Sequence, residues 1–387
     1  MKVTIVTDFP DRPDSPVGGV QAISVQLVHT LAQYVEHEIS VVTLSENVQS
    51  SDWSDWHGAK IIRLPRHEGN SLKVALGSGA KMIESAIEEI APDIVHSHDT
   101  YGLMVRNVDR PRIFTIHGFI HADIVVSESK FRKIRSLIWK YYETKGWTGH
   151  DAIISISPYV REVVREYFSG PIYNIDNPIA HEFFDISTSE CEMRVFSAAA
   201  ICRRKNTRGL VEAISILAGE GLDVTLSLAG PITEQRYYLD LCEFIEDRNL
   251  QNKVRFLGQI DISGICDQLS RSAVFALVSR EENSPVGIEE AMAVGVPVVT
   301  SNRCGMPYMV EHGYSGLLVD PESPRIIAAA IKKLVTCTAQ EYEVIQKRNI
   351  EIATSRFHPD VVAAKTYCAY QEVIEGGATF RFDHLQL

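Results

Sequence analysis

Long apolar runs are missing from this sequence, which has no stretch of 18 uninterrupted apolar residues and hence no membrane-spanning helix of ordinary length. The opening residues MKVTIVTDFP hold one lysine and a short β-like run, with no apolar stretch of signal-peptide length. The seven cysteines are scattered and never spaced as Cys-x-x-Cys, which disfavours a disulfide framework and a zinc site. We therefore expect a cytoplasmic protein with reduced thiols.

Positive charge is also scarce. The chain carries 38 Lys and Arg against 50 Asp and Glu, a formal net charge of -12. A surface that acidic binds polyphosphates poorly, which argues against a nucleic-acid partner. A pocket for a small anion needs only a few local cations, so a small anionic ligand remains compatible with the composition.

Short β-branched runs alternate with helical periods along all 387 residues, a length that suits two domains of roughly 150 residues or more. Val3 to Asp8 predicts a buried strand, and Val20 to Val35 has the apolar spacing of a helix. Strands separated by helices predict βαβ units and parallel sheets, an α/β fold. The polar segment Pro178 to Glu192 predicts a linker between a domain at 1–178 and a second domain at 193–358.

Parallel α/β sheets bind ligands at the carboxyl ends of their strands, so two such domains facing each other predict a cleft between them. The most informative stretch, Ser279 to Ser301, begins at a strand end and enters a helix. Glu282 and Glu290 flank its loop, and a carboxylate accepts hydrogen bonds from adjacent hydroxyls. Loop amides and the helix N-terminus between them can bind phosphates. The alternative is an acidic helix entrance with solvated carboxylates.

This stretch resembles the signature of the family-four glycosyltransferases, whose architecture of two Rossmann-like domains facing an interdomain cleft is called GT-B. The signature is Glu, seven residues, Glu, then Ala-Met and a Gly-x-Pro-Val-Val strand. Its positions are matched by Glu282, Glu290, Ala291, Met292, Gly295, Pro297, Val298 and Val299. Glu281 and Glu289 share the spacing, but the Ala-Met after Glu290 fixes the register.

The resemblance implies that Glu282 lies near the transferred sugar and that Glu290 binds the nucleotide ribose. Asn-Ser-Pro follows Glu282 where many members have Gly-Phe-Gly, so the sugar subsite is expected to differ. The donor-binding residues expected from this loop are Asn283, Ser284, Pro285 and Val286.

Two further motifs match the family near strand ends. Gly18 and Gly19 occupy the position of its Gly-Gly loop, where backbone can approach a diphosphate closely. A flexible loop with a helix cap is the alternative, and the absence of Gly-x-Gly-x-x-Gly excludes a dinucleotide fingerprint. His117 resembles the catalytic-site histidine that contacts the donor sugar or its phosphate. His96 and His98 are interpreted as structural, with lining of the acceptor site as the alternative.

The family usually places Arg, four residues and Lys after the first strand of the second domain, both directed at the diphosphate. Lys205 stands at the Lys position, but the Arg position holds Ala200. Arg203 and Arg204 are the nearby replacements, and we choose Arg204. A second departure is Tyr308, where members commonly have Glu.

The resemblance implies a retaining transferase that moves a hexose-type sugar from a UDP- or GDP-sugar to a glycan, lipid or small-molecule acceptor, in polysaccharide or glycolipid biosynthesis. It implies no metal and no cofactor, and a C-terminal helix at about 360–378 that packs back on the first domain. The alternatives are a nucleotide-sugar epimerase and a catalytically silent binding subunit, which the missing arginine at Ala200 favours.

Residues 129–146 form a basic segment with interspersed aromatic and aliphatic residues. Such a helix can lie on the anionic inner face of a membrane, with peripheral attachment. The simpler interpretation, which we favour from the sequence, is a surface helix packed on the first domain with solvated lysines.

Overall fold

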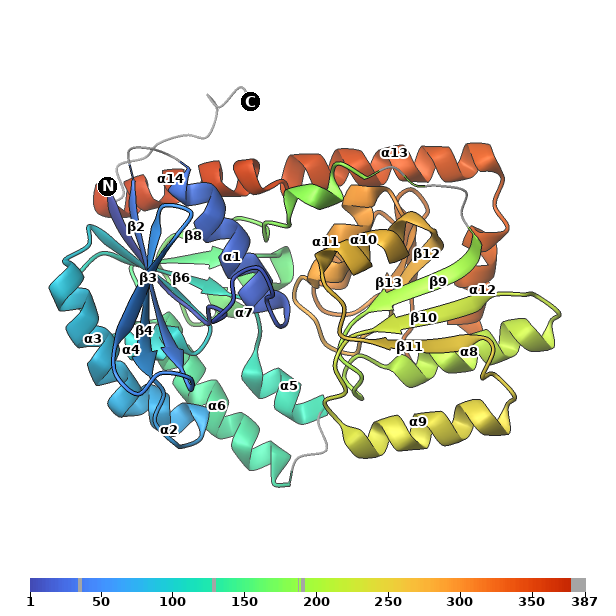
Figure 1. Ribbon diagram of the computed structural model, residues 1–387, viewed down its shortest axis with the longest axis horizontal. Coiled ribbons are helices and arrows are strands. Elements are labelled where there is room, and N and C mark those ends of the chain that lie inside the picture. Colours follow the sequence, from blue (N-terminus) through green and yellow to red (C-terminus); the bar gives the residue numbers. More distant parts are fainter. Residues whose placement is uncertain (34–36, 127–129, 187, 189–191, 377–387) are drawn as a thin grey trace. The chain divides into compact units, whose positions relative to one another are not determined.

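The computed structural model describes residues 1–33, 37–126, 130–186, 188 and 192–376 (Figure 1). Parts of several predicted features lie outside the described residues. These are Val35 of the first helix, Ser129 of the basic segment, residues 187 and 189–191 of the linker, and residues 377–378 of the last helix.

The chain divides into two compact units. The first unit comprises Met1–Ile120, Leu137–Pro178 and the chain from Pro359 onward, and the second comprises His121–Ser136 and Ile179–His358. The division by sequence differs at His121–Ser136, which it placed in the first domain. Those residues group with the second unit, where Asp123 contacts Arg204.

The first unit is built on an eight-stranded sheet in the order β3-β4-β2-β1-β5-β6-β7-β8. Every pair is parallel except β3 with β4. The strands are β1 (Lys2–Val6), β2 (Glu38–Ser45), β3 (Asp52–Trp56), β4 (Ala59–Pro65), β5 (Ile94–His98), β6 (Arg112–Ile116), β7 (Ala152–Ser155) and β8 (Ile172–Asn174).

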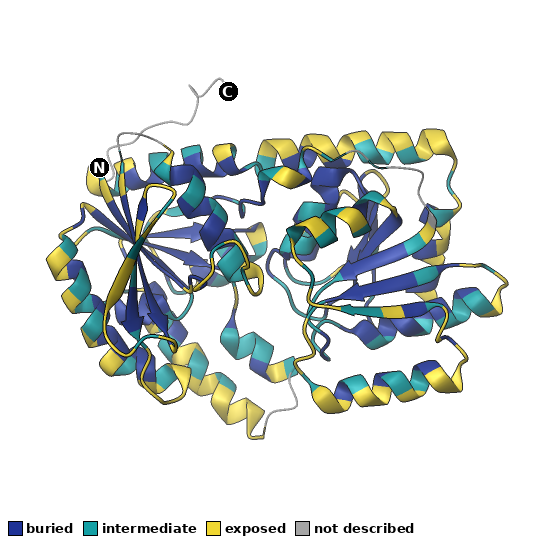
Figure 2. Cartoon of the chain, in the orientation of Figure 1, coloured by how far each residue is buried: buried dark blue, intermediate teal, exposed yellow. Residues whose placement is uncertain are grey.

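Burial explains which strands the sequence revealed. β1 and β2 are buried almost throughout and consist largely of apolar and β-branched residues, as expected for strands covered on both faces. β5 is equally buried but ends in the polar residues His96, Ser97 and His98. β3, with the sequence DWSDW, is a mostly exposed edge strand and gave no recognisable pattern. Figure 2 shows the same contrast between buried strands and exposed helix surfaces.

The helices of the first unit are α1 (Gly19–Ala32), α2 (Ser71–Leu76), α3 (Ser78–Ile90), α4 (Tyr101–Met104), α7 (Pro158–Arg165) and α14 (Pro359–Ile374). Two more helices, α5 (Ile120–Val126) and α6 (Arg132–Trp147), have residues in both units. The helix α14 packs against α1 and contributes Val362 and Tyr370 to a core with Val3 and Leu31. The C-terminal helix therefore belongs to the first unit.

The second unit is built on a six-stranded sheet in the order β11-β10-β9-β12-β13-β14, with every pair parallel. The strands are β9 (Glu192–Ala198), β10 (Thr225–Ala229), β11 (Val254–Gly258), β12 (Ser272–Leu277), β13 (Val298–Ser301) and β14 (Gly316–Val319). The helices are α8 (Thr207–Gly219), α9 (Gln235–Asp247), α10 (Ile262–Ser270), α11 (Val286–Val294), α12 (Pro324–Val335) and α13 (Ala339–Arg356), with short 3-10 helices η1 (His181–Phe183) and η2 (Met306–Tyr308).

Each sheet reverses its strand order at a central strand. β1 lies between β2 and β5, and β9 lies between β10 and β12. Ligands of open α/β sheets bind beyond the carboxyl ends of strands at such reversal points. The loop after β1 carries Gly18 and Gly19, and the loop after β9 carries Arg204 and Lys205. Topology therefore places predicted donor-binding residues at a reversal point of each sheet.

Candidate functional site

Two cationic side chains of the second unit converge on one carboxylate oxygen, that of Glu282. The Nζ of Lys205 lies 2.5 Å from Oε1 of Glu282, and Nη1 of Arg204 lies 2.6 Å from the same oxygen. The Glu282 side chain is only 11% exposed, against 15% for Lys205 and 28% for Arg204. Charge-assisted hydrogen bonds of this kind are among the stronger ones in proteins. We name Arg204, Lys205 and Glu282 the cation–carboxylate cluster.

Backbone and side-chain hydrogen bonds hold the two loops of the cluster together. The side-chain amide of Asn206 donates to the carbonyl oxygens of Val278 and Pro321, at 3.3 and 2.7 Å. The backbone amide of Arg280 donates to the carbonyl oxygen of Arg204 at 2.8 Å. The loop after β9 is thereby tied to the loop after β12, which fixes where Lys205 meets Glu282.

Gly305 sets the position of the Glu282 loop from the other side. Its backbone amide donates to the carbonyl oxygen of Glu282 at 2.9 Å. A Cβ atom added at Gly305 would lie 1.6 Å from the carbonyl oxygen of Asn283, far inside any allowed contact. Only glycine permits this approach, so the loop geometry depends on a residue outside the signature.

Arg203 and Arg204 point to different partners. Arg203 lies over the ring of Tyr237, 5.3 Å from its centroid, and Nε is 3.9 Å from a carboxylate oxygen of Glu234. Arg204 instead joins Glu282, and its Nε is 3.6 Å from Asp123 of α5. The structure therefore brings Arg204, and not Arg203, together with Lys205. Their part in binding a diphosphate stays a prediction.

Asp123 is a member of this site that the sequence did not reveal. Burial raises the pKa of its carboxyl to about 6, although Arg204 opposes the shift. The sequence around Asp123 in α5 matches no motif that was recognised, so only the fold brings this carboxylate to Arg204.

The helix α11 begins at Val286 after Pro285, directly beyond the Glu282 loop. A Cβ atom at Gly287 would lie 3.2 Å from the carbonyl oxygen of Ala198, so the start of α11 packs closely against the end of β9. The amides at this helix end therefore lie beside the strand whose following loop carries the cluster.

The two glutamates of α11 have different surroundings. Glu289 is fully buried and accepts a 2.7 Å hydrogen bond from the hydroxyl of Ser284, another predicted donor-binding residue. Glu290 is partly exposed as a residue, but its carboxyl lies away from water, and this burial raises the carboxyl pKa to about 8. The Ser284 hydroxyl is thus engaged inside the protein, while Asn283 is also buried and Val286 is half-buried.

In the first unit, Gly18 and His117 follow β1 and β6. Gly18 has φ 88°, which favours glycine, and it precedes α1, whose first residue is Gly19. The Nε2 of His117 lies 2.9 Å from Nδ1 of His98, and the backbone amide of His117 donates to Asp99. Burial lowers the pKa of His117 to about 4, so its imidazole is neutral at pH 7.

His96 and His98 lie in the interior of the same unit. His96 joins the hydroxyls of Tyr370 and Thr115, at 2.6 and 2.7 Å. Burial lowers the pKa of His96 to about 3 and that of His98 well below its usual value. His96 therefore links α14 to β6, the structural role expected for it, while His98 supports His117.

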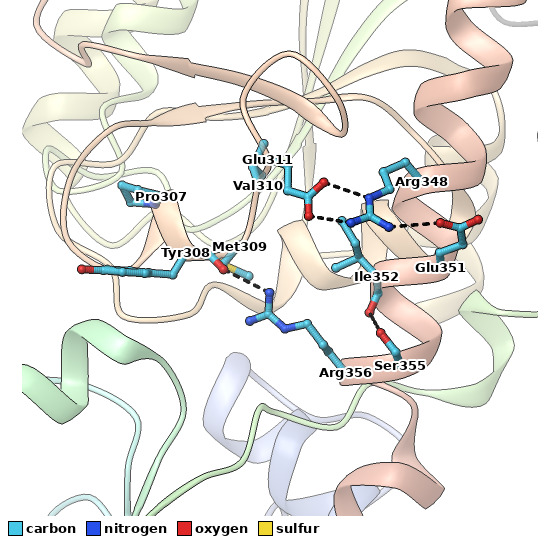
Figure 3. Close-up of a pocket in the computed structure, with 10 residues that line it drawn as sticks. All are labelled: Pro307, Tyr308, Met309, Val310, Glu311, Arg348, Glu351, Ile352, Ser355 and Arg356. Atoms are coloured by element: carbon cyan, nitrogen blue, oxygen red, sulfur yellow. Dashed lines mark hydrogen bonds and ion pairs between the residues drawn. The ribbon is translucent and has the colours of Figure 1, made fainter. Parts of the chain in front are cut away.

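A separate pocket of about 460 Å³ lies in the second unit between η2 and α13 (Figure 3). Arg348 forms a bidentate contact with Glu311 there, and Arg356 donates to the carbonyl oxygen of Tyr308. Tyr308, one of the residues that depart from the family pattern, lies in the wall of this pocket. None of the cluster residues lines it.

No group of three or more His, Cys, Asp or Glu side chains is arranged to hold a metal ion within the ranges that the structure describes. The metal-independence of the reaction stays a prediction, as does the absence of a cofactor.

Two family profiles match this chain. The profile of "Glycosyl transferases group 1" matches residues 179–351, and that of "Glycosyltransferase Family 4" matches residues 17–183. An uncharacterized glycosyltransferase of Methanocaldococcus jannaschii is 22% identical over 325 residues, which cover 82% of this chain and 85% of that protein.

Solved structures resemble the whole fold. Sucrose-phosphate synthase of Thermosynechococcus elongatus has a TM-score of 0.82 at 20% identity, covering 97% of this chain and 99% of the other. Anabaena HepE, in complex with UDP and glucose, has a TM-score of 0.73 at 18% identity, covering 96% and 99%. With the two family profiles on successive halves and the paired parallel sheets, the chain belongs to the family-four-like glycosyltransferases of the GT-B fold.

Proposed function

We propose that this glycosyltransferase acts in the cytoplasm and transfers a hexose-type sugar, with retention of anomeric configuration, from a UDP- or GDP-sugar to a glycan, lipid or small-molecule acceptor. Polysaccharide or glycolipid biosynthesis is the corresponding role. The observation that carries the proposal is the cation–carboxylate cluster beside the start of α11.

The cluster has the charges that donor binding needs. Glu282 pairs with both Arg204 and Lys205 and offsets one of their two positive charges. A diphosphate has two or more negative charges and can take over both cations, which frees the carboxylate to accept hydrogen bonds from sugar hydroxyls. Two fixed cations and helix amides offset the phosphate charge, so we propose that no metal is required.

The proposed chemistry needs no protein nucleophile. The bond between the anomeric carbon and the phosphate oxygen breaks as the acceptor oxygen forms a bond to the same face of that carbon. The acceptor proton passes to the departing phosphate oxygen. Arg204, Lys205 and the amides stabilise charge that grows on the diphosphate, and neutral His117 donates a hydrogen bond to the donor.

The related structures support the choice of donor. HepE has been solved with UDP and glucose and also with UDP-glucose, and it shares the fold of this chain. Glu290 is placed one turn into α11 and partly exposed, which suits a carboxylate that accepts hydrogen bonds from the ribose.

The decisive experiment incubates the full chain with a panel of UDP- and GDP-sugars, with and without glycan and lipid acceptors. Acceptor-dependent release of free nucleotide, with a glycosylated product of retained configuration, supports transfer. An altered nucleotide-sugar formed without acceptor would establish the epimerase alternative instead.

A catalytically silent binding subunit is the second candidate, because Ala200 replaces the arginine that the family usually supplies. Arg204 lies beside Lys205 and offers a second cation, which weakens this alternative. Nucleotide binding without turnover over the whole panel would favour it.

A further inference from the structure

The charge of α6 and the residues before it is opposite to that of the chain. Residues 130–146 contain six basic side chains and one acidic side chain, Glu143, whereas the complete chain has a net charge of -12. The basic side chains are Lys130, Arg132, Lys133, Arg135, Lys140 and Lys145. This part of the surface therefore attracts anions although the molecule as a whole repels them.

Apolar side chains of the same segment face solvent. Phe131 is 77% exposed, Ile134 59%, Leu137 68%, Ile138 43% and Tyr141 55%. Ile134, Leu137, Ile138 and Tyr141 follow the spacing i, i+3, i+4 and i+7, so they form one stripe along α6. We name these four residues the apolar stripe. Figure 2 shows the long exposed surface of this helix.

The opposite side of α6 is the one that packs against the protein. The Glu143 carboxylate accepts a 2.7 Å hydrogen bond from the backbone amide of Ile120, and Trp147 is buried. A Cβ atom at Gly146 would lie 3.5 Å from the side chain of Leu103. The helix therefore packs on the protein through this side, in keeping with the packed surface helix favoured from the sequence, and its apolar stripe is left exposed.

Cations border the stripe. With 100° of rotation per residue, Lys133 and Lys140 lie along one side of the stripe, and Arg135 lies along the other. Lys130 and Lys145 lie near the two ends of the stripe. The Nζ of Lys145 lies over the ring of Tyr141, 4.9 Å from its centroid. A helix with an apolar centre and lysine or arginine borders can insert the centre among acyl chains while its cations meet lipid phosphates.

We propose that α6 docks the protein peripherally on an anionic lipid surface, with the apolar stripe inserted at the boundary between headgroups and acyl chains. The described part of the chain holds no helix long and apolar enough to cross a membrane, so the attachment proposed is superficial. Nucleic acid would satisfy the cations but leave the apolar stripe in water. A second copy aligned on the same helix would bring two basic segments together.

Binding of the full chain to vesicles tests the proposal. The vesicles are pure phosphatidylcholine or phosphatidylcholine with about one third phosphatidylglycerol. We expect flotation with the anionic vesicles only, and progressive release as salt is raised. The double variant K133E/K140E should lower the partition coefficient at least tenfold, since each basic side chain near such a surface contributes about fivefold. The double variant I134S/L137S should also lower it by about tenfold or more.

Matched controls change equally exposed residues elsewhere. L239S alters an apolar side chain of α9 that is 56% exposed, and K81E reverses an exposed lysine of α3. Both should bind vesicles like the wild type, and all variants should retain the wild-type melting temperature. Equal binding to neutral and anionic vesicles, or loss of binding in the controls as well, would overturn the proposal. So would stripe-dependent dimerisation or RNA binding in the absence of any vesicle binding.

Discussion

The Nζ of Lys205 and the Oε1 of Glu282 lie 2.5 Å apart, and Arg204 contacts the same oxygen. Two cations thus share one carboxylate. Any diphosphate that binds them must compete with Glu282, so binding and the release of this carboxylate are linked. That linkage leads to opposite expectations for turnover and for nucleotide affinity.

Replacing Glu282 by Gln should lower turnover at least about a hundredfold, because the carboxylate that positions the transferred sugar is lost. The affinity for nucleoside diphosphate should be unchanged or higher, because Arg204 and Lys205 lose their competing partner. Turnover and calorimetric titration measure the two effects. Glu311→Gln, which removes a comparable carboxylate from Arg348, is the control and should retain turnover. Full activity of the Glu282 variant would remove this residue from the site.

Arg204→Ala and Lys205→Ala should each weaken nucleoside-diphosphate binding by about 1.5–3 kcal/mol, the range for hydrogen bonds to charged groups. Nucleoside affinity should change much less, because its ribose and base contacts survive. Arg203→Ala is the matched control, since its guanidinium lies on Tyr237 near Glu234. If none of the three variants weakens diphosphate binding more than nucleoside binding, the phosphates bind elsewhere. The silent-subunit alternative then gains support.

Glu290→Ala should weaken nucleotide binding by about 1.5–3 kcal/mol if its carboxylate accepts hydrogen bonds from the ribose. Because burial raises the Glu290 pKa to about 8, an ionised and better acceptor forms only as the pH rises through that value. Nucleoside affinity should therefore increase between pH 7 and pH 9. Calorimetry across this range should find a flat profile for Glu290→Gln.

The same group makes a prediction for stability. A carboxyl whose pKa is raised in the folded state holds its proton while the unfolded chain has lost it. The ordinary pKa of a glutamate is 4.5, and that of Glu290 in the folded protein is about 8. The folded protein therefore loses stability as the pH rises from 4.5 toward about 8. Glu290→Gln should reduce this loss, measured as melting temperature against pH. An unchanged pH dependence would place Glu290 in solvent.

Gly305→Ala should displace the Glu282 loop, since its Cβ would meet the Asn283 carbonyl oxygen at 1.6 Å. We expect destabilisation of about 1–3 kcal/mol, typical of overpacking, and a turnover loss of at least about tenfold. Gly219→Ala, at the end of α8 with no atom within 4 Å of the added Cβ, is the control. It should be neutral or slightly stabilising. Denaturant unfolding and turnover of both variants provide the comparison.

Local sequence patterns were sufficient to predict much of the secondary structure and to identify the family signature. The apolar spacing of residues 78–90 marks α3, and the β-branched run at Val298 marks β13, because burial imposes these periods on the sequence itself. The α/β class and the glycosyltransferase family follow from such patterns. The short helices α2 and α4 were not predicted because six and four residues are too few to show a helical period, although α4 is fully buried. The edge strand β3 was not predicted because it is mostly exposed.

The sequence by itself determined that Lys205, Glu282 and Glu290 are candidates, because each stands in a recognisable motif after a strand or at a helix start. Only the tertiary structure decided that Arg204 joins Lys205 while Arg203 turns to Tyr237. Tertiary structure also decided that the apolar stripe of α6 faces solvent. The directions of adjacent loop side chains, and the choice of which helix face packs, depend on partners distant in sequence, and these are close only once the chain has folded.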